Sequence, residues 1–412
     1  MTKKDKSVKK SPNSTNYFPK LRFPGFSDEW KRKKLEEVGE VINGLTYNPS
    51  NIDESGVLVL RSSNVQNRSI TLTDNVYVKT NNYNAVKEND ILICVRNGSK
   101  NLIGKNAIIE KHHEGLAFGA FMTIYRSDFN KFLFQWFDTK EYKDIINKNL
   151  GATINSINGG DLKKFKVPFP SIEEQNKISA FLSSLDSRIQ LSMKTIENLE
   201  SLKSSLLNKI FKRKNEFYKN KNWEERQLAQ ISHEHQDKNK KNLHNEVFSV
   251  AKNKGVINQI EHLGRSFSAS DISNYKLIYP GDLVYTKSPT SDFPFGIIKQ
   301  NRTNRIGVVS PLYCVFTPQS FALGYLIHEY FESAVNTFNY LNPLVQKGAK
   351  NTMNINNDTF LNGAELFLPI DEREQEKLYK LFSSVNQKIE IESRILEKLN
   401  QQKKYFLQNL FV

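Results

Sequence analysis

An internal repeat constrains the fold of this 412-residue chain more than any other feature of its sequence. Residues 175–211 align without gaps to residues 375–411, an offset of 200 positions. Further upstream, the run NDILI at Asn89–Ile93 matches GDLVY at Gly281–Tyr285. The repeat predicts two copies of one variable domain, each followed by one copy of a similar helix.

The two repeated helices carry the alternating three-and-four spacing of apolar residues that is typical of a coiled coil. Lys203 and Lys403 interrupt the two stripes at matching positions. A two-fold relation between the halves would pair the helices antiparallel and leave no free seam. Burial of each helix against its own domain alone is an open alternative. The predicted helix interface contains Ile178, Leu182, Leu185, Ile189 and Leu199 in the first copy, and Leu378, Phe382, Val385, Ile389 and Leu399 in the second.

The variable domains combine short β-rich runs such as DILICVRN with helical patterns such as FALGYLIHEYF. The predicted fold class is therefore α+β: two similar mixed α/β domains, separated by two long helices that form an antiparallel coiled coil with an internal pseudo-two-fold repeat. The expected segments are a basic disordered tail at 1–20, a first variable domain at 21–170, a first helical spacer at 171–214, a second variable domain at 215–369 and a second spacer at 370–412.

The net charge of +15 is unevenly distributed, because residues 1–34 alone carry 11 basic and 3 acidic side chains. Net charge therefore does not by itself make the variable domains bind nucleic acid.

The lysine-rich start lacks the apolar core of a signal peptide, and no stretch approaches the about 20 apolar residues of a membrane span. We expect a cytoplasmic protein. Cys94 and Cys314 are predicted to be buried free thiols.

Basic and amide side chains cluster in corresponding loops of both variable domains. Arg and Lys can bind guanine edges or phosphate, and Asn can pair with adenine, so these clusters are candidate DNA contacts. The candidates are Arg61, Asn64, Arg96, Asn97, Lys100 and Asn155 in the first domain, and Lys252, Lys287, Arg302, Arg305, Lys350 and Asn351 in the second.

Catalytic and metal-binding patterns match the sequence poorly. The fragment Asn342–Val345 lacks the second proline and the aromatic residue of an adenine methyltransferase motif, and the glycines after Gly98 have the wrong spacing for a phosphate-binding loop. Asp282 with Lys287 resembles a nuclease pair, but a turn role for Asp282 before a strand is the better interpretation. The histidines of His233–His235 are too close for a helical zinc face. We predict no catalytic residues and no metal site.

Several of these features together resemble the specificity subunits of type I restriction-modification systems. The resemblance rests on LRFPGF at Leu21–Phe26, the repeated Gly/Asn-Asp-apolar strand, and a proline followed by EEQ or EREQ that opens each long helix. The chain departs from the family pattern at Asn89, where a glycine is usual.

This resemblance implies two target-recognition domains that read a bipartite double-stranded DNA site, and helical regions that bind two adenine methyltransferase subunits. Restriction subunits would join that complex. S-adenosylmethionine, ATP and Mg²⁺ would then be bound by the partner subunits, and this chain would catalyse nothing. Divergent loops in the two halves predict an asymmetric site. A self-contained enzyme and a coiled-coil scaffold without DNA readout are the alternatives; methyl transfer by the chain alone would favour the first, and absence of sequence-specific DNA binding the second.

Overall fold

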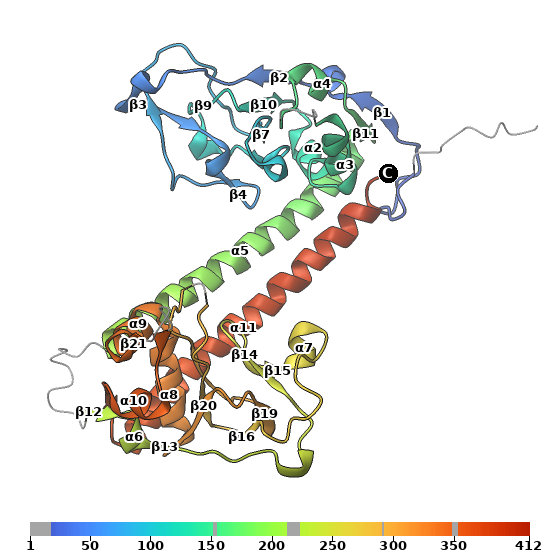
Figure 1. Cartoon of the computed structure of the whole chain (residues 1–412). Coiled ribbons are helices and arrows are strands. Elements are labelled where there is room, and N and C mark those ends of the chain that lie inside the picture. The colour runs from blue at the N-terminus through green and yellow to red at the C-terminus, as the bar shows by residue number, and fades with distance from the viewer. Residues whose placement is uncertain (1–17, 151–154, 212–222, 291, 348–352) are drawn as a thin grey trace, which may run out of the picture. The chain divides into compact units, whose positions relative to one another are not determined.

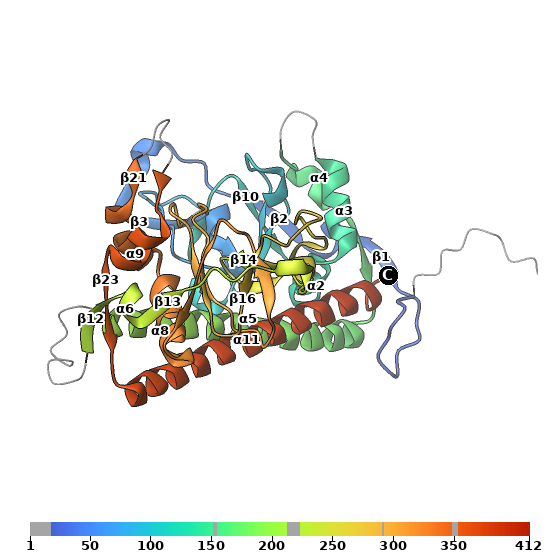
Figure 2. The same ribbon diagram turned by 60° about the horizontal axis from the view of Figure 1, so that its bottom comes forward.

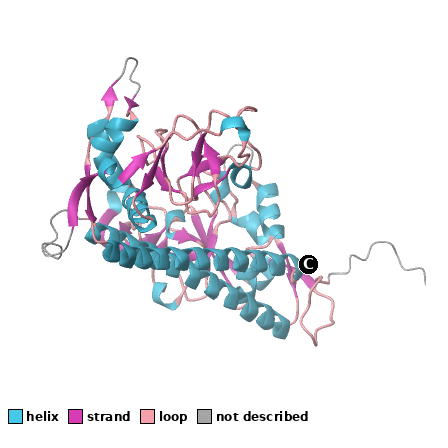
Figure 3. Ribbon diagram, turned by 90° about the horizontal axis from the view of Figure 1, so that it is seen from below, coloured by secondary structure: helices cyan, strands magenta, loops and turns pink. Residues whose placement is uncertain are grey.

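The computed structural model describes residues 18–150, 155–211, 223–290, 292–347 and 353–412. The chain forms two compact units (Figure 1). The first unit comprises Met1–Met193 and Arg394–Val412, and the second comprises Lys194–Ser393. Each unit thus contains one variable domain and one end of both long helices. Both units mix helices with short strands (Figure 3).

The elements of the first unit confirm the predicted mixture of short strands and helices. Its strands are β1 (Lys31–Lys34), β2 (Glu40–Asn43), β3 (Ile52–Leu60), β4 (Val65–Gln66), β5 (Ser69–Ile70), β6 (Tyr77–Val78), β7 (Ile91–Cys94), β8 (Asn106–Ile108), β9 (Ala117–Phe118), β10 (Met122–Arg126) and β11 (Lys166–Phe169). Its helices are α1 (Leu35–Val38), α2 (Asn130–Trp136), α3 (Lys140–Asn149), α4 (Gly159–Lys163) and the first part of α5 (Ile172–Ile210).

A four-stranded antiparallel sheet of order β2-β10-β7-β8 forms the centre of the first unit. Strand β7 is buried on both faces, because successive side chains point to opposite sides of a strand. Ile91 and Ile93 join the apolar core that contains α2 and α3. Leu92 and Cys94 join a second core formed with β3. The continuous apolar run of β7 therefore reflects two cores that share one strand.

The second unit repeats this arrangement with the order β13-β20-β17-β18. Its strands are β12 (Trp223–Gln227), β13 (Ser232–Glu234), β14 (Phe248–Ala251), β15 (Gly255–Asn258), β16 (Lys276–Ile278), β17 (Leu283–Tyr285), β18 (Ile298–Gln300), β19 (Gly307–Val309), β20 (Cys314–Pro318), β21 (Gln346–Lys347), β22 (Met353–Asn354) and β23 (Glu365–Pro369). Its helices are α6 (Leu228–Ile231), α7 (Gln259–Leu263), α8 (Phe321–Glu332), α9 (Ala334–Leu341), α10 (Asn357–Asn362), the end of α5 and the start of α11 (Glu372–Asn409).

The central strand β17 of the second unit is also shared by two cores. Leu283 and Tyr285 lie in one core and Val284 in the other. Before each central strand the chain turns through a left-handed residue, Gly281 in this unit and Asn89 in the first. Asparagine is one of the few side chains that tolerates this conformation, which explains how Asn89 replaces the usual glycine.

The long helices pack antiparallel within the first unit (Figure 2). The ring of Phe181 on α5 contacts that of Phe406 on α11, while Asp186 further along α5 pairs with Lys403, which lies earlier on α11. Leu407 and Leu410 share one core with residues of α5. The end of the second spacer therefore packs in the first unit, and burial of each helix against its own domain alone was the wrong alternative.

The predicted helix interface is mostly buried in each unit. In the first unit the core contains Ile178, Leu182, Leu185 and Leu399, with Ile189 packed at its edge. In the second unit Leu378 and Phe382 lie in the main core together with Leu207 and Ile210 of α5, and Val385 is also buried. Leu199 and Ile389 are half-buried.

A largely buried cluster of charged side chains joins both helices to the variable domain in the first unit. Lys403 Nζ lies 2.5 Å from Asp186 Oδ1 and 2.7 Å from Asp138 Oδ2. Gln135 of α2 donates a hydrogen bond to Asp186, and the Arg68 guanidinium lies 3.6 Å from Asp138. Burial alone would raise the pKa of Asp138, but the charges of Arg68 and Lys403 outweigh it and hold that pKa well below its usual value.

The second unit has a corresponding cluster around Glu329 of α8. Lys203 Nζ of α5 lies 2.8 Å from Glu329 Oε2, and Asn386 of α11 donates a hydrogen bond of 2.8 Å to Glu329 Oε1. Arg302 pairs with the same carboxylate at 2.9 Å. The lysines that interrupt the two apolar stripes are thus cations of these clusters, Lys403 buried and Lys203 half-buried.

We predict that Lys403→Met lowers the free energy of unfolding by about 3 kcal/mol, since it leaves two largely buried carboxylates without their shared cation. Urea unfolding followed by tryptophan fluorescence measures this, because Trp30 and Trp136 both lie in the core of the first unit. Lys404→Met is the matched control: its side chain is exposed, and a change within about 0.5 kcal/mol is expected. Equal stability of the two variants would contradict a stabilising role for the cluster.

Candidate nucleic-acid interface

Three loops that the sequence singled out in the first domain lie together in the first unit. They follow β3, β7 and α3, and they are joined at Asn97: its side chain donates a hydrogen bond of 3.0 Å to Ser62 Oγ, and its backbone N–H donates to Asn155 O at 3.3 Å. Asn155 in turn donates its amide to Gly98 O at 3.0 Å. Arg96 forms a β-bridge with Ser156. We call residues 61–64, 96–100 and 155–156 the first loop cluster.

The candidate side chains of this cluster differ in how exposed they are and therefore in how readily they could bind a ligand. Arg96 and Lys100 are exposed, and Asn97 is half-buried. Arg61 is partly exposed, and its guanidinium pairs with Asp74 at 2.8 Å. The exposed cations Arg96 and Lys100 are therefore the side chains best placed for an anionic ligand.

Asn64 differs from its expected role. Its side chain is fully buried, donates hydrogen bonds to Thr71 O and Asp74 O, and accepts one from Arg61 N. These bonds use both amide hydrogens and the amide oxygen, so Asn64 closes its own loop in this conformation. The run SSNVQN is rich in turn-forming residues, which is consistent with this loop-closing role. A sequence pattern alone, however, does not distinguish an amide that caps its own loop from an exposed amide.

Sequence reasoning missed Phe121, which lies in the turn before β10. Its carbonyl oxygen accepts hydrogen bonds from Val95 N and Arg96 N. Its ring is exposed and lies 5.8 Å from the Arg96 guanidinium. In the sequence it begins the apolar run FMTIY, which gives no sign that its ring faces solvent.

The candidate residues of the second domain are more strongly neutralised by neighbouring acids. Lys252 pairs with Asp292, and its ammonium lies 5.6 Å from the ring of Phe293. Lys287 is half-buried with a left-handed backbone, and burial lowers the pKa of its ammonium. Lys350 and Asn351 lie outside the described residues.

Two arginines of the second domain are paired with acidic side chains: Arg302 is half-buried, whereas Arg305 is exposed. Arg302 stacks on Tyr325 at 3.5 Å and pairs with the buried Glu329. Arg305 lies 2.8 Å from Glu246 and 3.1 Å from Glu261. Their acidic partners are distant in sequence or lie on other elements, so the run NRTNR alone did not reveal these pairs.

The repeated Asp residues have the turn role that the sequence indicated. Asp282 accepts hydrogen bonds from Tyr279 N and Thr317 Oγ1, and lies 3.0 Å from His235 Nε2. Asp90 accepts from Lys87 N and pairs with Arg126. Both carboxylates are buried and occupied by protein partners, which argues against a metal-binding nuclease role for Asp282.

Among the described residues, no cluster of three or more His, Cys, Asp or Glu side chains has the arrangement of a metal site. Both cysteines are free and buried, and burial raises the pKa of Cys94 to about 11 and that of Cys314 to about 12, so their thiols are protonated at neutral pH. Within the described ranges, no helix has the length and apolar character needed to cross a bilayer.

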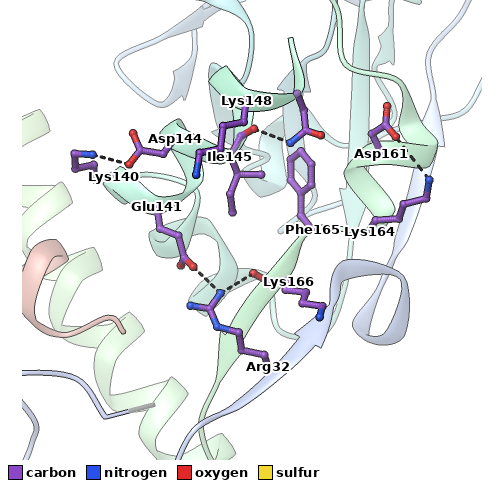
Figure 4. Close-up of a pocket in the computed structure, with 11 residues that line it drawn as sticks. Arg32, Lys140, Glu141, Asp144, Ile145, Lys148, Asp161, Lys164, Phe165 and Lys166 are labelled. Carbon is purple, nitrogen blue, oxygen red and sulfur yellow. Dashed lines mark hydrogen bonds and ion pairs between the residues drawn. The ribbon is translucent and has the colours of Figure 1, made fainter. Parts of the chain in front are cut away.

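A hollow of the first unit, about 650 Å³ in volume, lies beside α3 and β11 (Figure 4). Its three carboxylates are paired: Glu141 with Arg32 at 2.6 Å, Asp144 with Lys140 at 2.5 Å, and Asp161 with Lys164 at 3.8 Å. With its acids paired in this way, the hollow does not present a pair of carboxylates poised for acid–base chemistry.

Residues 27–201, which contain the whole first loop cluster, match the family described as the type I restriction modification DNA specificity domain. Over this segment the chain is similar to that family. The resemblance to type I specificity subunits is confirmed by curated relatives with that description. The chain is 30% identical over 211 residues to a chain named as the MjaX type I restriction enzyme specificity subunit of Methanocaldococcus jannaschii, with 47% of this chain and 48% of that one covered. It is 27% identical over 191 residues to the EcoKI specificity subunit of Escherichia coli, with 42% and 39% covered.

The chain spans less than half the length of these two curated relatives in the matched regions. A crystal structure of the type I restriction-modification S subunit from M. genitalium has a similar fold, with a TM-score of 0.63 at 15% identity. That similarity covers 96% of this chain and 99% of the other, so it includes both units. The specificity-subunit fold therefore extends beyond the segment that the family match covers.

We predict that Asn64→Ala destabilises this specificity domain by about 1–3 kcal/mol, because two backbone carbonyls and one N–H lose a buried partner. Lys100→Ala in the same loop cluster is the control and should change the free energy of unfolding by no more than about 0.5 kcal/mol. Hydrogen exchange of residues 61–74 gives the local readout. Unchanged exchange and stability in Asn64→Ala would show that the side chain is not needed to close the loop.

Proposed function

We propose that this protein is the DNA specificity subunit of a type I restriction-modification complex and reads a bipartite, asymmetric site in double-stranded DNA. The observation that carries the proposal is the repetition of one sheet order, β2-β10-β7-β8 and β13-β20-β17-β18, with a polar loop after the central strand of each sheet. One such domain would read each half of the site. The family match of the first domain supports DNA as the ligand.

The side chains after the two central strands support readout of different half-sites. In the first unit the exposed Arg96 and Lys100 offer a guanidinium and an ammonium for guanine edges or phosphates. In the second unit the corresponding loop contains the half-buried Lys287, and Lys252 is paired with Asp292. Because the two sets of donors differ, identical half-sites would not suit both domains.

The proposed partners are two adenine methyltransferase subunits and restriction subunits in a cytoplasmic complex, with S-adenosylmethionine, ATP and Mg²⁺ bound by those partners. Exposed apolar side chains on the long helices support binding of other proteins: Leu191 on α5 in the first unit, and Leu202 and Ile391 on the two helices in the second. Catalysis belongs to the partners in this proposal. Methyl transfer to DNA by the purified chain alone would contradict it.

Exchange of residues 35–170 for the equivalent segment of a related subunit should change one half of the methylated motif and leave the other half unchanged. The measurement is methylome sequencing of cells that express the chimaera with its methyltransferase partners, compared with the parent chain. The matched control exchanges residues 223–369 and should change the opposite half. A change in both halves after either single exchange would contradict independent readout.

We further expect Arg96→Ala and Lys287→Ala to weaken DNA binding without disrupting subunit assembly, because each side chain follows the central strand of its sheet. A lost base contact should cost about 1–3 kcal/mol, whereas a lost phosphate contact should mainly reduce the dependence of affinity on salt. Affinity of the assembled complex for its methylated motif is measured at several salt concentrations. Lys166→Ala, which removes an exposed lysine on β11, is the control. Wild-type affinity and salt dependence would remove Arg96 or Lys287 from the interface.

A further inference from the structure

Each recognition domain has one exposed apolar side chain in the equivalent turn. In the first domain, Thr123 of β10 pairs with Ile93, which lies three residues after Asp90. In the second domain, Cys314 of β20 pairs with Tyr285, which likewise lies three residues after Asp282. The residues two positions before these strand partners are Phe121 and Leu312, in the turns that lead into β10 and β20 (Figure 1). They are therefore structural equivalents despite their different side chains.

Both side chains are exposed to solvent, although the strands that follow them are largely buried. Phe121 is 53% exposed and Leu312 is 77% exposed, whereas the adjacent Met122 is 1% exposed. A single exposed apolar residue needs no explanation on a protein surface. Its recurrence at one position of two domains whose loops have diverged does point to a shared function.

The surroundings of Phe121 indicate what this function is. The carbonyl of Phe121 accepts the N–H groups of Val95 and Arg96, which fixes its turn to the first loop cluster. The Arg96 guanidinium lies 5.8 Å from the ring. An aromatic side chain beside an exposed cation suits a ligand with both anionic and apolar parts.

DNA presents that combination in its major groove, where phosphates border the 5-methyl group of thymine. Apolar side chains such as Phe discriminate thymine by contact with this methyl group, which no other base carries in normal DNA. A protein acidic patch would satisfy the arginine but would leave the ring exposed.

We propose that Phe121 and Leu312 each contact a thymine 5-methyl group, one in each half of the DNA site. This inference rests on the proposed DNA-reading function and adds two specificity-determining residues to it. Phe121 would act on the half read by the first domain and Leu312 on the half read by the second. The polar donors of the neighbouring loops would then read the remaining base edges.

The test uses the complex of the full chain with its methyltransferase subunits and duplexes that carry the methylated motif. Each thymine of the motif, on either strand, is replaced in turn by deoxyuridine, which lacks the 5-methyl group and retains the base-pairing edge. One replacement in each half should weaken wild-type binding about fourfold, the value for one buried methyl-sized group. In Phe121→Ala the effect should vanish in one half and persist in the other, and Leu312→Ala should show the reverse.

Matched variants separate this contact from changes in folding or assembly. Phe121→Leu keeps an apolar side chain and should retain part of the deoxyuridine effect. Ile52→Ala removes a side chain of the same unit that is also 53% exposed, and it should behave as the wild type. Assembly of every variant with the methyltransferase subunits is measured alongside DNA affinity.

Specific binding of the motif with deoxyuridine effects that are the same in wild type and both alanine variants would overturn this inference and leave the proposed function intact. A motif half without an A·T pair would also overturn it. Weaker subunit assembly of Phe121→Ala, with a deoxyuridine effect that persists in both halves of the motif, would assign the side chain to a protein partner instead. Absence of any sequence-specific DNA binding by the wild-type complex would overturn the proposed function together with the inference.

Discussion

A lysine that pairs with acidic side chains of neighbouring elements joins the long helices to the recognition domain in each unit; Lys403 is buried and Lys203 is half-buried. Lys403 lies between Asp138 and Asp186, and Lys203 bonds to Glu329. Isolated charges at these places would be strongly destabilising, so the pairs require the helices and the domain to meet in one register. Apolar side chains alone tolerate sliding by one turn more easily. The charged clusters therefore specify an arrangement that the apolar stripes only stabilise.

The two clusters reach the same electrostatic result with different residues. Asp186 of the first copy corresponds to Asn386 of the second, and the acid that binds Lys203 comes from α8 of the recognition domain. An arginine of the recognition domain completes each cluster, Arg68 in one unit and Arg302 in the other. The lysine position is common to both copies, whereas the acidic residues that pair with the lysine are not. The residues around this lysine have therefore diverged between the two units.

Much of this architecture could be predicted from the sequence, because a repeat and an apolar periodicity report directly on packing. The long helices and the Asp turns before the central strands agree with the structure. Whether a given side chain is exposed or already bonded to another part of the protein could not be predicted in the same way. Arg302 and Asn64 have the composition of exposed binding residues, yet their partners are Glu329 and backbone carbonyls that only the fold brings close. Phe121 is the opposite case, since an apolar residue at a strand start leaves no sign in the sequence that it faces solvent.

The composition of the first unit has a consequence for synthesis on the ribosome. Its core contains Trp30 from the beginning of the chain together with Leu407 and Phe411 from its end, and the rings of Trp30 and Phe411 are in contact. The second unit consists of the continuous segment Lys194–Ser393. Domains usually fold in the order in which they emerge. Here the segment translated first has to wait for residues 394–412 before its core can close, so the second unit is the one able to fold first during translation.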